Sequence, residues 1–328
     1  MTLALVVAAL VGIEPLTAQI NSAFAGVRPD PAPEEITRDT HYLAGNEWRL
    51  DLLAPRVAGT GGTYVGVGAD QNYLLAGWAR SNLVLLCDFD QWIVDLHAIY
   101  GVAFSVAATP DAFVDFWNRK SPRQAIAAIR ERTPDPKDAQ RLVKLYKFAR
   151  VRVFVRLSKL RDDLAKRNVV SVLTSQEDYD HVRGLSRSGR IIATRADLTK
   201  PGALRQLADV LGEAALPVHV LYLSNAEQYF PYRPVFRANI QAWPASSGAI
   251  VVRTRPMAHD YTYVVQPLSD FREQLARSDV KSVRDLAPKR VLTAKRPVYD
   301  VPREPPMAKP QKLAKKKRAG RPLQASNR

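Results

Sequence analysis

The chain of 328 residues lacks several features that would assign it to a class at once. It has a single cysteine, Cys87, so no disulfide can form within the chain. It contains neither the P-loop signature nor the Gly-x-Ser-x-Gly elbow of many hydrolases. Its five histidines show no metal-ligand spacing: His41, His97, His181, His219 and His259. We therefore expect no metal site and no disulfide framework.

Long hydrophobic runs are also scarce. Residues 3–13 form an apolar stretch of 11 residues, which is too short to span a bilayer as a helix. Together with Ala23-Phe24-Ala25 before Gly26, the stretch resembles a signal peptide over residues 1–25. However, no lysine or arginine precedes it, and a buried N-terminal helix is the alternative reading. We expect no transmembrane span, and both a cytoplasmic and an exported location stay open.

The charge is unevenly distributed. Residues 1–118 carry 5 basic and 13 acidic side chains, whereas residues 119–168 carry 16 basic and 5 acidic ones. Residues 288–328 carry 13 basic and 2 acidic side chains and almost no apolar mass, so we expect a disordered basic tail. Such a tail attracts anionic partners such as nucleic acid through their phosphates. The segment 315–322 resembles an AT-hook that Ala319 interrupts, and a simple solvated tail is the alternative.

Short apolar strands alternate with helical segments between a Pro-rich linker, residues 26–41, and the tail. Helices are predicted at 73–79, 93–106, 201–212 and 233–242, and the basic segment 119–168 is predicted to be a helical insertion, although 151–155 would also suit a strand. Strands are predicted at 63–67, 83–87, 169–173, 191–194, 218–223, 249–253 and 261–266. This alternation predicts one α/β domain, residues 42–287, with a mostly parallel Rossmann-like sheet and helices on both faces.

A glycine turn follows the first predicted strand. Gly66 and Gly68 precede Asp70 and Asn72, which open a helix. Asp88 and Asp90 follow the next strand, 20 and 22 positions after Gly68, where a carboxylate can reach a ribose hydroxyl pair. A carboxylate at Asp70 would repel a pyrophosphate and attract a ligand ammonium or sulfonium, which disfavours a dinucleotide. Alternatively, Asp70 only caps its helix.

These pieces, from residue 62 to residue 266, resemble the class I S-adenosylmethionine-dependent methyltransferases. The resemblance implies S-adenosylmethionine as cofactor and assigns to its binding Gly66, Gly68, Asp70, Asn72, Asp88, Asp90 and Asp197, the last of these near the adenine ring. The sequence departs from the family pattern in two places: Asp70 replaces the third glycine, and Ser-Asn-Ala-Glu at 224–227 replaces Asn-Pro-Pro-Tyr. Parts of the chain are also similar to an uncharacterised bacterial family, which implies no activity.

The segment after the strand at 218–223 falls where the resemblance places the substrate. Ser224 and Asn225 are candidate substrate-binding residues, and Asn225 can accept a hydrogen bond from a substrate amine or hydroxyl. Glu227 is the candidate general base, and Tyr229 a candidate aromatic wall. The alternative is that Ser224 and Asn225 cap the next helix.

Three hypotheses therefore stand. The first is a methyltransferase-like enzyme acting on a small-molecule or protein substrate. The second is a non-catalytic or degenerate domain of the same fold. The third is a protein associated with nucleic acid through its basic segments. Export would weaken the first hypothesis, since S-adenosylmethionine is a cytosolic metabolite.

Overall fold

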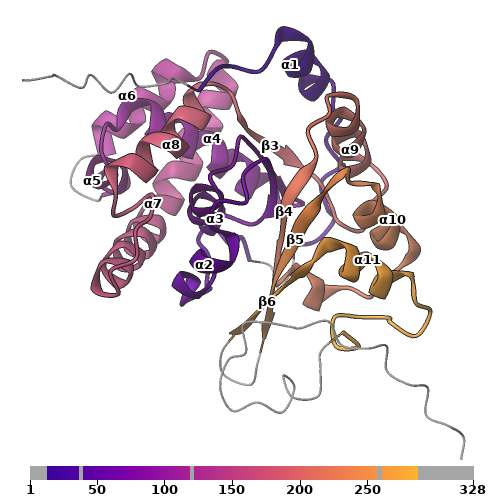
Figure 1. The fold of residues 1–328 in the computed structure, drawn as a ribbon. Coiled ribbons are helices and arrows are strands. Elements are labelled where there is room, and N and C mark those ends of the chain that lie inside the picture. The colour runs from indigo at the N-terminus through magenta and orange to yellow at the C-terminus, as the bar shows by residue number, and fades with distance from the viewer. Residues whose placement is uncertain (1–12, 37–39, 119–121, 257–260, 287–328) are drawn as a thin grey trace, which may run out of the picture.

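A computed structural model describes residues 13–36, 40–118, 122–256 and 261–286 (Figure 1). The predicted tail, its AT-hook-like segment and most of the N-terminal apolar stretch lie outside these residues. One sheet of six strands runs through the centre of the described chain, with the order β3-β2-β1-β4-β5-β6. The strands are β1 (Thr63–Val67), β2 (Leu83–Asp88), β3 (Ile191–Arg195), β4 (Val218–Ser224), β5 (Ala245–Pro256) and β6 (Tyr261–Pro267).

The first five strands are parallel, and β6 pairs antiparallel with β5. The predicted α/β class with a mostly parallel sheet is therefore confirmed. The strands β2 and β3 lie on one side of β1, whereas β4, β5 and β6 lie on the other side. The order of strands reverses between β1 and β4, and a crevice opens at such a point beyond the carboxyl ends of the strands.

Eleven α helices occur in the described residues and cover both faces of the sheet (Figure 1). None of these helices is both long enough and apolar enough to cross a membrane. Their bounds are α1 (Ala18–Ala25), α2 (Ala54–Val57), α3 (Gln71–Ala79), α4 (Gln91–Val106), α5 (Pro110–Asp115), α6 (Pro122–Arg132), α7 (Pro136–Lys166), α8 (Gln176–Arg187), α9 (Ala203–Glu213), α10 (Pro234–Ala242) and α11 (Leu268–Ala276).

Alternate residues of each strand feed two separate hydrophobic cores. In β2, Val84 and Leu86 pack under the helices α3, α4, α7 and α8, whereas Leu85 and Cys87 pack under α1, α9, α10 and α11. This period of two is what a strand covered on both faces requires. Burial raises the pKa of the Cys87 thiol to about 12, so this cysteine is a packing residue.

The strand predicted at residues 169–173 is wrong. Val172 and Leu173 are buried in the core under α8, but the segment forms a turn between α7 and α8. The indole N–H of Trp78 donates to the carbonyl of Val170, and the Ser171 hydroxyl accepts from the N–H of Leu173. These bonds serve backbone groups without a partner strand, so the end of this apolar run is buried without belonging to the sheet, while Val170 is 61% exposed.

The N-terminal segment, which the sequence divides into a signal peptide and a linker, packs on the domain. Leu16 and Phe24 lie in the core under α9, and Asp30 is 4% exposed. The Asp30 carboxylate accepts hydrogen bonds from the backbone N–H groups of Asp197 and Ala203, at 2.8 and 2.9 Å. Residues 16–30 are thus attached to the end of β3 and to the start of α9.

Helix α7 carries most of the basic segment, and residues 151–155 belong to this helix. Its inner face is part of the core, through Leu142, Tyr146 and Leu157 among others. The buried Arg156 guanidinium donates from Nε to the Asp70 carboxylate over 3.0 Å, and the two side chains are 4% and 1% exposed. The same carboxylate accepts the backbone N–H of Gly45. This ion pair joins α7 to the turn after β1.

We expect Arg156→Met to lower the free energy of unfolding by about 3 kcal/mol, because the buried Asp70 charge would lose its partner. Urea denaturation measures this loss. Arg161→Met is the matched control, since Arg161 pairs with Asp111 at the surface and such pairs contribute about 0–1 kcal/mol. The double variant Arg156→Met/Asp70→Asn should recover part of the loss. Equal effects of the two single variants would contradict this assignment.

Candidate functional site

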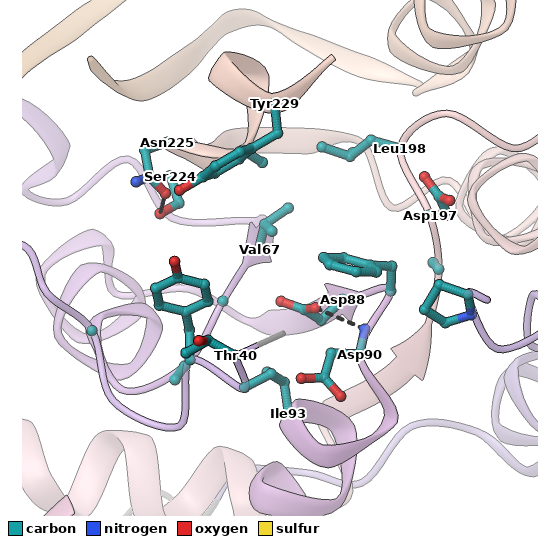
Figure 2. A pocket seen from close by; sticks show the side chains of 18 of the residues that line it. Thr40, Val67, Asp88, Asp90, Ile93, Asp197, Leu198, Ser224, Asn225 and Tyr229 are labelled. Atoms are coloured by element: carbon teal, nitrogen blue, oxygen red, sulfur yellow. Dashed lines mark hydrogen bonds between the residues drawn. The ribbon is translucent and has the colours of Figure 1, made fainter. Parts of the chain in front are cut away.

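A pocket of about 310 Å³ lies at the carboxyl ends of β1 to β4 (Figure 2). It occupies the point where the strand order reverses, which is where ligands bind in open α/β sheets. The segment before α2 crosses over it and contributes Thr40, Tyr42 and Asn46. The strand ends contribute Val67, Gly68, Ala69, Asp88, Phe89, Asp90, Ala196, Asp197, Leu198, Thr199, Ser224 and Asn225.

The glycine turn forms one wall of the pocket. Gly68 lines the pocket and has φ +90°, a conformation that a side chain would strain. Gly66 lies behind the wall, where a Cβ atom would stand 2.0 Å from the Asn72 side-chain oxygen. Asn72 is fully buried and donates to the carbonyl oxygens of Val67, Gly68 and Ala69. Gly66 and Asn72 therefore shape the turn and lie outside the pocket lining.

Asp70 has a different position from the one that the sequence suggested. Its carboxylate lies outside the pocket lining and pairs with Arg156 of α7. It does not cap α3 either, because the structure shows no capping hydrogen bond from its side chain. A cation of a ligand in the pocket would thus find the Asp70 charge already neutralised.

Asp88 is the carboxylate that projects into the centre of the pocket (Figure 2). One of its oxygens accepts the backbone N–H of Asp90 at 2.9 Å. Burial raises the pKa of Asp88 to about 7, and the neighbouring Asp90 charge adds to this rise, whereas backbone hydrogen bonds from Asp90 and Gly68 oppose it. The charged form of Asp88 is therefore disfavoured by burial, and a ligand that donates hydrogen bonds to it would stabilise that form.

Asp90 also lines the pocket, but both of its oxygens have partners. One accepts the N–H of Trp92 and caps α4, and the other lies 2.7 Å from the Nδ1 atom of His41. The His41 ring in turn stacks on Trp92, with 3.9 Å between ring centroids. Asp90 fixes the start of α4 and the crossing segment, whereas Asp88 is the carboxylate that projects into the centre of the pocket (Figure 2).

Asp197 lies at the far edge of the pocket, at the end of β3 (Figure 2). Its carboxylate accepts hydrogen bonds from the backbone N–H and the hydroxyl of Thr199. Its own N–H donates to Asp30. The N-terminal segment thus fixes the loop that carries Asp197 and the apolar Leu198.

The residues predicted at the end of β4 separate into two groups. Ser224, Asn225 and Tyr229 line the pocket, and Tyr229 is 40% exposed at its rim (Figure 2). Glu227 is 2% exposed and lies outside the lining, where its carboxylate accepts from the Tyr232 hydroxyl and pairs with Arg253. Asn225 precedes the short 3₁₀ helix η3 (Ala226–Tyr229) but makes no capping hydrogen bond from its side chain.

Ser224 combines an unusual backbone with a buried acid. Its φ of +51° is rare for a residue with a Cβ atom, and its hydroxyl donates to Glu47 over 2.7 Å. Burial raises the pKa of Glu47, while the hydrogen bonds from Tyr222 and Ser224 lower it. Sequence reasoning missed Glu47, because only the fold brings this residue to the tip of β4.

Other missed residues are apolar. Phe89, Ile93, Leu198 and Phe230 give the pocket surfaces suited to a flat heterocycle. Phe89 stands between the two predicted aspartates, and that position was the available signal. No feature of the sequence indicated that Thr40, Tyr42 and Asn46 of the crossing segment would line the pocket.

The polar lining of the pocket is acidic. It contains Glu35, Asp88, Asp90 and Asp197, and no lysine, arginine or histidine is among the described residues that line it. Such a pocket repels phosphates and favours ligands with hydroxyl groups or positive charge. Within the same described residues no group of three or more potential ligands is placed to hold a metal ion.

Fold and site together define an α/β protein with an acidic pocket at the reversal of strand order. Residues 42–300 match the model of a family described as a domain of unknown function (DUF7790), and the chain belongs to this family. No curated protein matches the chain.

We expect Asp88→Asn to stabilise the protein at high pH. Because burial raises the pKa of Asp88 from 3.8 to about 7, the folded state binds more protons than the unfolded state between these values. The stability contributed by this group therefore falls as the pH rises through that window. Above pH 7 the free energy of unfolding measured by urea denaturation should be higher for the variant than for the wild type, by about 1 kcal/mol or more. Near pH 4 this difference should vanish. Asp209→Asn, at an exposed position of α9, should show no such pH dependence. A constant offset for Asp88→Asn at every pH would refute the assignment.

Proposed function

We propose that the chain binds S-adenosylmethionine in this pocket and acts as a methyltransferase-like enzyme. The observation that carries the proposal is the projecting Asp88 carboxylate beside the glycine turn, in a lining whose described residues include acidic side chains and no cationic ones. A dinucleotide would bring two phosphates into this acidic pocket, whereas an adenosyl sulfonium brings a positive charge. A carboxylate is also the group that accepts both hydroxyls of a ribose.

The arrangement of the sheet supports the same proposal. Five parallel strands in the order 3-2-1-4-5, followed by an antiparallel strand, agree with the resemblance found in the sequence. Asp88 would hold the ribose, and Phe89 and Leu198 would contact the adenine, because they are apolar lining residues that closely follow the ends of β2 and β3. Gly68 would lie against the amino-acid end of the cofactor. When bound, the cofactor would supply an activated methyl group.

The acceptor of the methyl group would enter beside β4. The Asn225 amide oxygen can accept a hydrogen bond from an amine or hydroxyl, and Tyr229 offers an aromatic face at the rim. Glu227 is turned away from the pocket, so it does not serve as the base here. Transfer from a sulfonium depends mainly on alignment of the nucleophile, which a site with few polar groups can provide.

A non-catalytic nucleoside-binding domain is the second candidate function. The position of Glu227 favours it, since the pocket then has no acid aimed at the acceptor side from η3. Both candidates predict adenosyl binding, and only turnover separates them. Transfer of a labelled methyl group to any acceptor would decide for the enzyme.

We expect S-adenosylmethionine and S-adenosylhomocysteine to bind with micromolar Kd in calorimetric titration, and NAD to bind much more weakly. Asp88→Asn should weaken binding by about tenfold or more, because a hydrogen bond to a charged group is lost. Gly68→Arg should abolish it, since the side chain would enter the pocket. For the wild type, affinity should fall as the pH drops below 7, as Asp88 takes up a proton.

Asp209→Asn serves as the control with the same chemical change at an exposed site outside the pocket. Circular dichroism would establish that each variant is folded. Absence of heat with millimolar S-adenosylmethionine would end the proposal, and so would equal affinities of Asp88→Asn and the wild type.

We infer that residues 16–27 stay in the mature protein, because Leu16, Phe24 and Val27 are part of the core under α9. Cleavage after Ala25 would remove Leu16 and Phe24 from the core under α9 and expose the apolar area that they cover. The mass of the protein purified from its own cells should therefore include residues 16–25. A mature chain that begins at Gly26 would refute the inference.

A further inference from the structure

Helix α7 presents an exposed basic and aromatic surface beside the pocket. Side chains spaced three or four residues apart lie on its outer side, where residues of one helix face meet. We call this surface the α7 face and define it by Lys144, Lys147, Phe148, Arg152, Val155 and Lys159, all of which are exposed.

The α7 face has an excess of positive charge. Residues 139–161 hold eight basic and no acidic side chains. Five of the eight bind groups of the protein: Arg141 binds Asp95, Arg150 binds the Asn118 carbonyl, Arg152 binds the His41 carbonyl, Arg156 binds Asp70, and Arg161 binds Asp111. In the part of the chain that the structure describes, Lys144, Lys147, Arg152 and Lys159 form no ion pair. Their charge is therefore directed outward, toward an anionic partner.

Aromatic rings lie between these cations. Phe148 is 60% exposed and meets the edge of Trp92, with 5.3 Å between ring centroids. Trp48 is 38% exposed, but the Lys159 ammonium and the Arg156 guanidinium lie over its ring, 4.0 and 4.7 Å from the centroid, so Phe148 is the principal ring for stacking. Cations alternating with exposed rings are typical of surfaces that bind single-stranded nucleic acid, because phosphates contact the cations while unpaired bases stack on the rings.

The surface is also hollowed. A groove of about 1120 Å³ is lined by Lys144, Lys147, Phe148 and Trp92, together with the loop between α6 and α7. A flat bilayer cannot enter such a groove, and a duplex hides the faces of its bases. A flexible strand with unpaired bases fits both the groove and the rings.

A short series of contacts leads from the groove to the pocket. Phe148 contacts Trp92, Trp92 stacks on His41, and His41 binds Asp90 in the pocket lining. A strand on the α7 face would therefore pass close to the mouth of the pocket. The acidic pocket would repel the phosphates of this strand and still admit a base.

We propose that the α7 face binds single-stranded nucleic acid and that this polymer is the methyl acceptor. The second half of this inference rests on the proposed function, and the first half does not. The surface supplies the phosphate contacts and the stacking, and Asn225 and Tyr229 receive the base.

The test measures fluorescence anisotropy of labelled single-stranded RNA and DNA, of about 12 nucleotides each, with the full-length protein and without cofactor. Lys144→Glu/Lys147→Glu should lower the affinity by about tenfold or more and reduce the salt dependence by about two ions. Phe148→Ala should lower it by about fivefold or more, through lost stacking. Arg187→Glu/Lys200→Glu makes the same charge change at exposed positions away from the α7 face and should have little effect. The basic tail is present in every variant, so its contribution cancels.

Three outcomes would overturn the binding proposal. One is equal affinity of the wild type and the Lys144→Glu/Lys147→Glu variant. Another is tighter binding of a matched duplex than of the single strand. The third is binding of phosphatidylserine vesicles, but of no oligonucleotide, that depends on Lys144 and Lys147. Calorimetry with S-adenosylmethionine is independent of these measurements, so failure of the cofactor proposal and failure of the α7 face can be told apart.

Discussion

The buried ion pair between Asp70 and Arg156 is the constraint on which the rest of the structure depends. It joins three parts of the chain, because the same Asp70 carboxylate also accepts the N–H of Gly45 in the segment that crosses the pocket. Arg156 lies over the Trp48 ring as well, 4.7 Å from its centroid. Moving two charges out of water costs free energy, and this cost offsets much of what their attraction contributes to stability. The gain is in position: the glycine turn, the crossing segment and α7 are held in one arrangement.

This arrangement decides which carboxylates a ligand meets. Asp70 is neutralised by α7, and Asp90 is engaged by the start of α4 and by His41. Asp88 remains, buried enough that its pKa rises to about 7. A charge kept in such an environment lowers stability, and proteins retain such charges where a ligand uses them.

The sheet was predictable because its strands are buried on both faces. Runs such as residues 83–87 are apolar throughout, and no long-range contact is needed to recognise them. Residues 169–173 show the limit of this reasoning, since they are also mostly apolar but form a turn, with hydrogen bonds to Trp78 and Ser171, in which Val170 is 61% exposed. A pattern of hydrophobicity reports burial, whereas membership in a sheet depends on a neighbouring strand. The helix α8 that follows begins with a Ser175 cap, a local signal that the sequence does contain.

The candidate site was predictable in outline, and its details depended on contacts between distant residues. Spacing brought Gly68, Asp88 and Asp197 to one edge of the sheet. Spacing could not distinguish Asp88 from Asp90, because the difference lies in His41 and in the N–H of Trp92. Nor could it show that Asp70 meets a partner 86 positions away, or that Glu227 turns toward Tyr232.

The acidic and basic parts of the sequence form two different surfaces of the folded protein. The acidic N-terminal part supplies Asp88 and Asp90 to the pocket, and the basic segment supplies the α7 face next to it. A polyanion would be attracted to the α7 face and repelled by the acidic pocket, so its backbone would stay outside the pocket while a neutral group enters. The Asp70–Arg156 pair lies at the boundary of the two regions, where it neutralises an acid that would face α7 and a cation that would face the turn. The acidic pocket and the basic α7 face can therefore lie next to each other without neutralising each other's charge.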